Sequence, residues 1–256
     1  MGVPARARII GYAAIMAALV WPQPLLAAGY TTLTVMPSFF TSQNSSGTRV
    51  SVYDLALTAN YHSKHWQASI TAPLLTVTGP GVLSAGTIYT TPQAYGRRAG
   101  LGDIWLEGSL SLSRPGVFRP AVTPYALIKL PSGSRAAGLG TGTTDYEAGA
   151  GMMWRWQSFY PSLWLGYRVV HNSPSYRWGG RFLITVGGSY SLGQAGFLTL
   201  LFERRDKGHA QPPAETLFLS YTRPISRHLS LILFGLHGFT TSSTDYGAGL
   251  GARIRF

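Results

Sequence analysis

The sequence predicts an all-β fold, a transmembrane antiparallel β-barrel of about twelve strands with both termini in the periplasm. Three observations carry this prediction. Side chains alternate between apolar and polar with a period of two, which is typical of strands whose two faces meet different surroundings. The connectors alternate between short and long, as the periplasmic turns and extracellular loops of outer-membrane barrels do. The last residue is an aromatic, Phe256.

The first residues are typical of an export signal. Arg6 and Arg8 form a positive n-region, residues 9–20 an apolar h-region, and Leu26-Ala27-Ala28 a cleavage site of small residues. The alternative, an N-terminal membrane anchor, needs roughly 20 apolar residues, and this run is shorter. We therefore expect residues 1–28 to be a signal peptide and residues 29–256 to form the barrel.

Composition restricts the class of protein further. The 256 residues include 31 Gly, 14 Tyr and 7 Trp, and only 12% are charged, which suits a surface that faces lipid. Without cysteine the chain can form neither a disulfide nor a thiolate metal site. The formal net charge is +12, but the basic residues are scattered rather than gathered on one face, so we expect no nucleic-acid partner. No phosphate loop or cofactor fingerprint occurs, and we expect no cofactor.

The alternation is clearest over residues 245–256 and 145–156. In both segments the even positions are apolar and the odd positions are mostly Gly, Asp, Glu or Arg. The two share the pattern Thr-Asp-Tyr-x-Ala-Gly-x-Gly, which starts at Thr144 and Thr244. The same reasoning predicts strands at 31–41, 50–61, 65–77, 101–113, 119–130, 143–156, 158–171, 180–192, 195–206, 214–223, 227–239 and 244–256.

Aromatic residues fall near both ends of the predicted strands, where membrane interfaces favour them. A soluble β-sandwich or lipocalin-like barrel is the alternative, but it would bury its apolar face. Two features stay open. Strand 227–239 is apolar on both faces, so either could face lipid, and Pro37, Pro73 and Pro124 lie within strands, where we expect bulges or strand ends.

Charged side chains are expected to face the lumen, because a Lys or Arg at the membrane midplane costs about 2 to 4 kcal/mol. They either line a pathway for a solute or form a salt-bridged plug. The longest connector, 79–100, could narrow the lumen with Ile88, Tyr89 and Tyr95, or lie on the surface. The expected inner-wall residues are Asp54, Asp103, Glu107, Lys129, Asp145, Glu147, Arg155, Arg168, Arg181, Glu203 and Arg253, together with Arg205 and Arg255.

Catalysis has little support in the sequence. His171-Asn172-Ser173 places a Ser and a His at an outer strand end, as outer-membrane lipid hydrolases do, but no third member is evident. His62 and His65 offer only two metal ligands in a turn. We expect neither a catalytic residue nor a metal site.

Three segments carry a family resemblance. Gly100-Leu101-Gly102-Asp103, Lys129-Leu130-Pro131-Ser132-Gly133 and Gly138-Leu139-Gly140-Thr141-Gly142 resemble the G-L-G-D, K-L-P-T-G and G-x-G-T-G motifs of the outer-membrane transporter family of the phenol meta-degradation pathway. Ser132 replaces the usual Thr, and Ser134 stands where Asp is common. The resemblance implies passive uptake of small aromatic or hydrophobic compounds.

The sequence thus predicts a channel in the Gram-negative outer membrane. Its expected partners are outer-membrane lipid and lipopolysaccharide, the barrel-assembly machinery, which would recognise the strand ending in Phe256, and a small-molecule solute. The alternatives are a structural or adhesive barrel with a blocked lumen, and a lipid-modifying enzyme.

Overall fold

The computed structural model describes residues 29–43, 49–84, 87–90, 96–170, 180–206 and 213–256. The predicted signal peptide, residues 1–28, lies outside the described residues, so it stays a prediction. No helix in the described part of the chain is long and apolar enough to cross a membrane.

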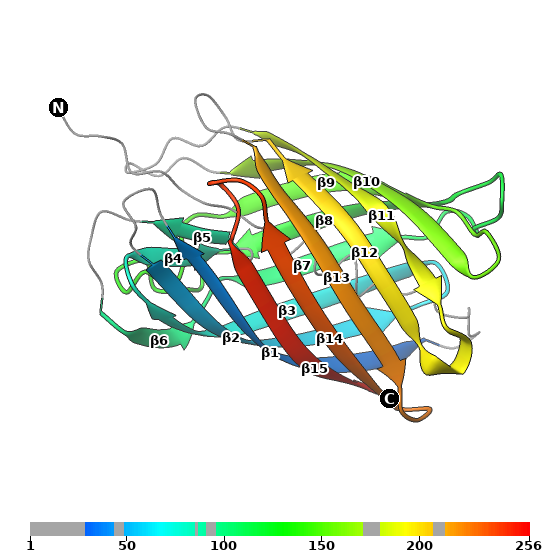
Figure 1. The fold of residues 1–256 in the computed structure, drawn as a ribbon, viewed down its shortest axis with the longest axis horizontal. Coiled ribbons are helices and arrows are strands. Elements are labelled where there is room, and N and C mark those ends of the chain that lie inside the picture. The colour runs from blue at the N-terminus through cyan, green and yellow to red at the C-terminus, as the bar shows by residue number, and fades with distance from the viewer. Residues whose placement is uncertain (1–28, 44–48, 85–86, 91–95, 171–179, 207–212) are drawn as a thin grey trace.

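The predicted antiparallel barrel of 12 strands is confirmed. β1 pairs with both β2 and β15, which closes the sheet, and Figure 1 shows β1 in blue beside β15 in red. β6 and β7 both pair with β3 and are two pieces of one barrel strand. The barrel strands are β1 (Tyr30–Gln43), β2 (Arg49–His62), β3 (Trp66–Thr78), β6 (Arg98–Leu101), β7 (Ile104–Leu110), β8 (Ala121–Leu130), β9 (Asp145–Met153), β10 (Phe159–Val170), β11 (Arg181–Ser191), β12 (Phe197–Arg205), β13 (Ala214–Pro224), β14 (Leu229–Gly238) and β15 (Tyr246–Arg255).

Two smaller elements are not part of the barrel sheet. β4 (Gly81–Ser84) and β5 (Thr87–Thr90) pair only with each other, as a hairpin inside the long connector between β3 and β6. A short 3-10 helix, η1 (Gly193–Ala195), lies in the turn between β11 and β12.

The two ends of the barrel differ in their connectors. Phe256 donates its backbone N–H to the Thr31 carbonyl at 2.9 Å, so the C-terminus lies beside the start of β1. We call this the termini end and the opposite one the loop end. The termini end carries the connectors 63–65, 111–120, 154–158, 192–196 and 225–228. Connector 111–120 is longer than expected, because β7 ends and β8 begins inside the predicted bounds of their strands.

A bulge interrupts the fourth barrel strand. Thr71 pairs with Trp105, whereas Leu74 pairs with Leu101, so the register changes by one residue at Gly102 and Asp103. Pro73 lies opposite, and its carbonyl accepts the Gly102 N–H at 2.8 Å. The bulge expected at Pro73 lies on the strand opposite it, while β3 itself continues through Pro73 in register with β2. The expectation of a bulge or strand end is wrong for Pro37 and Pro124, which lie within β1 and β8, although each lacks a pairing partner on one side.

Large apolar side chains cover the outer wall. Leu33, Leu57 and Ile70 are exposed there, and exposed aromatic residues gather at both ends. Some of these aromatics meet on neighbouring strands: the Tyr61 and Trp66 rings are 5.1 Å apart, and the Tyr167 and Phe182 rings 4.9 Å apart. An exposed apolar surface of this extent is stable against lipid, so the outer wall defines a transmembrane barrel.

Candidate functional site: the barrel interior

Most of the expected inner-wall residues lie inside the barrel. Glu107 borders an interior cavity, and Arg253 reaches Thr34 of β1 at 3.3 Å. Arg155 requires correction: β9 ends at Met153, so Arg155 lies exposed in the turn 154–158, its guanidinium 6.0 Å from the Tyr160 ring centre. The buried members are Asp54, Asp103, Lys129, Asp145, Glu147, Arg168, Arg181 and Glu203, with Arg205.

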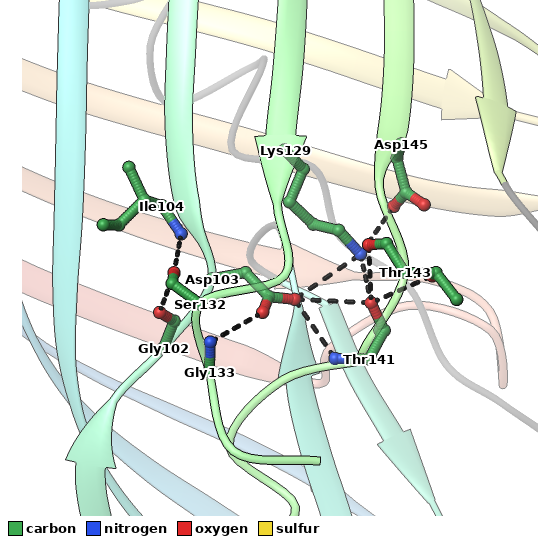
Figure 2. Close-up of polar contacts among 9 residues, drawn as sticks. All are labelled: Gly102, Asp103, Ile104, Lys129, Ser132, Gly133, Thr141, Thr143 and Asp145. Atoms are coloured by element: carbon green, nitrogen blue, oxygen red, sulfur yellow. Dashed lines mark hydrogen bonds and ion pairs between the residues drawn. The ribbon is translucent and has the colours of Figure 1, made fainter.

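Lys129 is the centre of a buried ion cluster near the loop end (Figure 2). Its Nζ lies 2.8 Å from the Asp145 carboxylate and 3.5 Å from that of Asp103, and it donates to the Thr141 hydroxyl. The Lys129 side chain is fully buried. A buried ammonium needs partners of this kind, because loss of hydration is otherwise uncompensated.

Asp103 holds connector 131–144 against the barrel wall. It accepts the backbone N–H of Gly133 at 3.1 Å and that of Thr141 at 3.1 Å. Ser132 donates its hydroxyl to the Gly102 carbonyl at 2.9 Å and accepts the Ile104 N–H at 2.8 Å. The bulge in the fourth strand thus provides the polar groups that bind this connector.

The three segments that carry the family resemblance therefore meet at one place. The G-L-G-D segment provides Asp103, the K-L-P-S-G segment provides Lys129 and Gly133, and the last provides Thr141. At Gly140 a Cβ would lie 2.2 Å from the Asp103 carboxylate, so only glycine fits there. The residues of the three segments are therefore the ones that connector 131–144 needs in order to pack closely against the barrel wall.

Connector 131–144 also extends into the lumen. Leu139 is 3% exposed and belongs to an apolar cluster inside the barrel, with Ala137 packed against it. Sequence reasoning placed the constriction in connector 79–100 and missed this one. The signal that could have revealed it is Leu139 between two glycines, a lone apolar side chain in an otherwise small and polar loop.

The interior has an apolar half, which the sequence analysis did not predict. On β14, Ile232, Phe234 and Leu236 are buried inside, while Leu231 and Leu233 are exposed on the outer wall. The lipid-facing side of the predicted strand 227–239 is therefore the one that carries Leu231 and Leu233. The Phe218 and Phe234 rings stack 5.5 Å apart. The apolar cluster comprises Met36, Phe40, Val50, Val52, Ala56, Leu75, Val77, Leu139, Leu201, Phe218, Ile232, Phe234 and Leu236.

The opposite part of the inner wall, on β7 to β12, carries most of the buried charged side chains, with Asp54 of β2 as an exception. Arg168 donates its Nε to Glu147 at 2.7 Å, and Tyr125 donates its hydroxyl to the same carboxylate at 2.9 Å. Arg205 and Glu203 form an ion pair at 2.8 Å. Glycines make room for large rings here: Tyr125 lies against Gly149 and Gly166, where any Cβ would clash with it.

A small cavity lies within this charged part of the inner wall. It has about 20 Å³ of space, enough for one water-sized group. Its lining residues are Glu107, Tyr125, Leu127, Glu147, Trp164, Gly166, Leu183, Thr185 and Glu203.

Two predicted features cannot be located. Tyr95 and the segment His171-Asn172-Ser173 lie outside the described residues. Ile88 and Tyr89 belong to β5, whose side chains are likewise not described, so the constriction by connector 79–100 stays a prediction.

The outer wall and closed sheet define a transmembrane β-barrel of the outer-membrane type, and solved structures agree. The chain shares its fold with the COG4313 outer membrane channel from Pseudomonas putida F1, at a TM-score of 0.71 and 14% identity over 93% of this chain and 100% of that one. It is also similar to the β domain of the Bordetella autotransporter BrkA, with a TM-score of 0.53 and 9% identity over 89% and 99% of the two chains. The transport unit of the autotransporter AIDA-I from Escherichia coli gives a TM-score of 0.51 and 9% identity over 96% and 98%.

No protein-family model and no curated protein matches the sequence. Barrels of this class reside in the outer membrane of Gram-negative bacteria. The similar structures named above are a channel and two autotransporter domains rather than enzymes.

Proposed function

We propose that this protein is a passive channel for small aromatic or hydrophobic compounds in the outer membrane. The observation that carries the proposal is the apolar half of the inner wall, around Phe40, Phe218 and Phe234. Water-filled porins have polar interiors. An apolar inner surface instead lowers the free energy of an apolar solute within the barrel.

The orientation of the barrel in the outer membrane is part of the same proposal. We infer that the termini end faces the periplasm, because most of its connectors are short, and that the loop end faces the lipopolysaccharide leaflet. The strand ending in Phe256 would then be available to the assembly machinery from the periplasmic side.

A second candidate is a barrel with a blocked lumen. One observation favours it: connector 131–144 enters the interior, and Leu139 is buried in the apolar cluster. Conductance in planar bilayers separates the two candidates. Steady open steps support a channel, whereas a folded barrel without conductance and without solute uptake supports the blocked form.

The decisive test compares an aromatic probe with a sugar. Intact Gram-negative cells that produce the barrel should take up N-phenylnaphthylamine faster than cells without it, and arabinose uptake should change less. Phe234→Ser should reduce the preference for the aromatic probe. Leu233→Ser, on the outer wall of the same strand, is the matched control and should leave it unchanged. Equal stimulation of both solutes would refute an apolar pathway.

A further inference from the structure

One of the carboxylates around the lumen cavity has no ion-pair partner among the described residues. Three carboxylates line it, those of Glu107, Glu147 and Glu203. Arg168 neutralises Glu147 and Arg205 neutralises Glu203. No residue in the described part of the chain forms an ion pair with Glu107.

Glu107 borders the cavity from the middle of the fourth barrel strand. It lies on β7, opposite Leu127 of β8, which in turn pairs with Glu147 of β9. A second carboxylate therefore lies two strands away on the same inner wall. Glu107 itself is half-buried, so its carboxylate loses part of its hydration, which is costly unless a positive charge accompanies it.

The remaining lining residues are suited to an ammonium group. The Tyr125 and Trp164 rings meet edge to face 5.8 Å apart, and both residues line the cavity. Aromatic faces attract cations, and Thr185 adds a hydroxyl that can accept a hydrogen bond. No set of three His, Asp or Glu side chains among the described residues converges as metal ligands do.

We propose that this cavity, with Glu107 as its charged acceptor, binds the head group of a protonated primary amine. A primary ammonium group is about the size of a water molecule and has donors for several acceptors at once. The single negative charge left by Glu107 matches its single positive charge. The site goes beyond the proposed transport function, because a folded barrel can bind an amine whether or not it conducts apolar solutes.

Thermal stability in a non-ionic detergent provides the test, since a ligand that binds only the folded barrel raises its unfolding midpoint. Methylammonium chloride should raise the midpoint above that in sodium chloride of equal ionic strength. Tetramethylammonium chloride, which is too large for the cavity and has no N–H donor, should not. The folded fraction is measured from heat-modifiable mobility on gels.

Variants of the protein test whether stabilisation by methylammonium comes from binding at the Glu107 cavity. Glu107→Gln keeps the side-chain shape and should weaken the apparent affinity for methylammonium by about ten- to a hundredfold, the loss expected for a charged hydrogen-bond partner. Glu215→Gln, on the outer wall beside Arg204, should leave it unchanged. If Glu107→Gln does not fold, Trp164→Leu tests the aromatic contribution and should also weaken binding.

Some results would overturn the site. These are a wild-type barrel that does not distinguish methylammonium from sodium, or a folded Glu107→Gln barrel that binds methylammonium as tightly as the wild type. The first would mean that Glu107 carries a proton rather than a counter-cation. A barrel that binds methylammonium but takes up no aromatic probe would refute only the proposed transport.

Discussion

Removing the Lys129 amine should release connector 131–144 from the lumen. In the Lys129→Ala variant, Asp103 and Asp145 lose their buried cation, and Thr141 loses its donor. The carboxylates then repel each other, and hydration can be regained only if the connector moves away. We expect the barrel wall to persist, because its ladders do not depend on the Lys129 side chain.

The free-energy cost of losing the Lys129 amine can be estimated from its distances to the two carboxylates. At an effective dielectric constant of about 20, attraction is about 6 kcal/mol for the 2.8 Å pair and about 5 kcal/mol for the 3.5 Å pair. The cost of burying the charges offsets much of this, and loss of one partner of a buried pair typically costs 3–5 kcal/mol. Because the connector can open locally, this cost appears as an opening equilibrium shifted by at least about a hundredfold.

Limited trypsin digestion measures that equilibrium, because Arg135 lies within the connector. Cleavage after Arg135 should be at least about a hundredfold faster in Lys129→Ala, given rapid opening and closing. The exposed pair of Arg204 and Glu215 provides the control, since Arg204→Ala should change this rate little. Unchanged cleavage after Arg135 in a folded Lys129→Ala barrel would refute the role assigned to the cluster.

Three further predictions concern other segments. Gly140→Ala should speed the same cleavage, because its Cβ would lie 2.2 Å from the Asp103 carboxylate, whereas Gly116→Ala, whose nearest contact would be at 3.6 Å, should not. Deleting Phe256 should reduce membrane insertion, and normal yield with heat-modifiable mobility would show that assembly does not require it. Trimming connector 79–100 should raise conductance in planar bilayers, and unchanged conductance of a folded barrel would place that connector outside the lumen.

The outer wall could be predicted from the sequence because contact with lipid places the same requirement on every outward-facing side chain. Each lipid-facing position must be apolar, so the period of two remains visible along most strands, and charged residues are forced inward. Asp54, Lys129, Glu147 and Arg168 were placed inside on this ground alone, and they are buried there. Arg155 was misplaced because the same alternation continues past Met153, where the strand already ends.

The pairing of the charged residues could not be predicted in the same way. Alternation gives the face of a side chain but not its partner across the lumen or in a loop. Four carboxylates lie on the inner faces of the two strands beside Lys129, those of Asp103, Glu107, Asp145 and Glu147, so alternation alone leaves four candidate partners. Lys129 contacts two of them, Asp103 and Asp145, whereas Glu147 pairs with Arg168. The bulge at Gly102 decides this, because it directs Asp103 toward connector 131–144.

The apolar half of the interior explains why one strand was ambiguous. β14 shows no clear alternation because Leu231 and Leu233 face lipid while Ile232, Phe234 and Leu236 face the apolar cluster. Both faces are apolar, so the difference that makes strands recognisable disappears. In a barrel whose other strands alternate, a strand without alternation is therefore a signal in itself. It marks the part of the inner wall whose side chains pack in the apolar cluster, and the proposed passage of an apolar solute depends on this part.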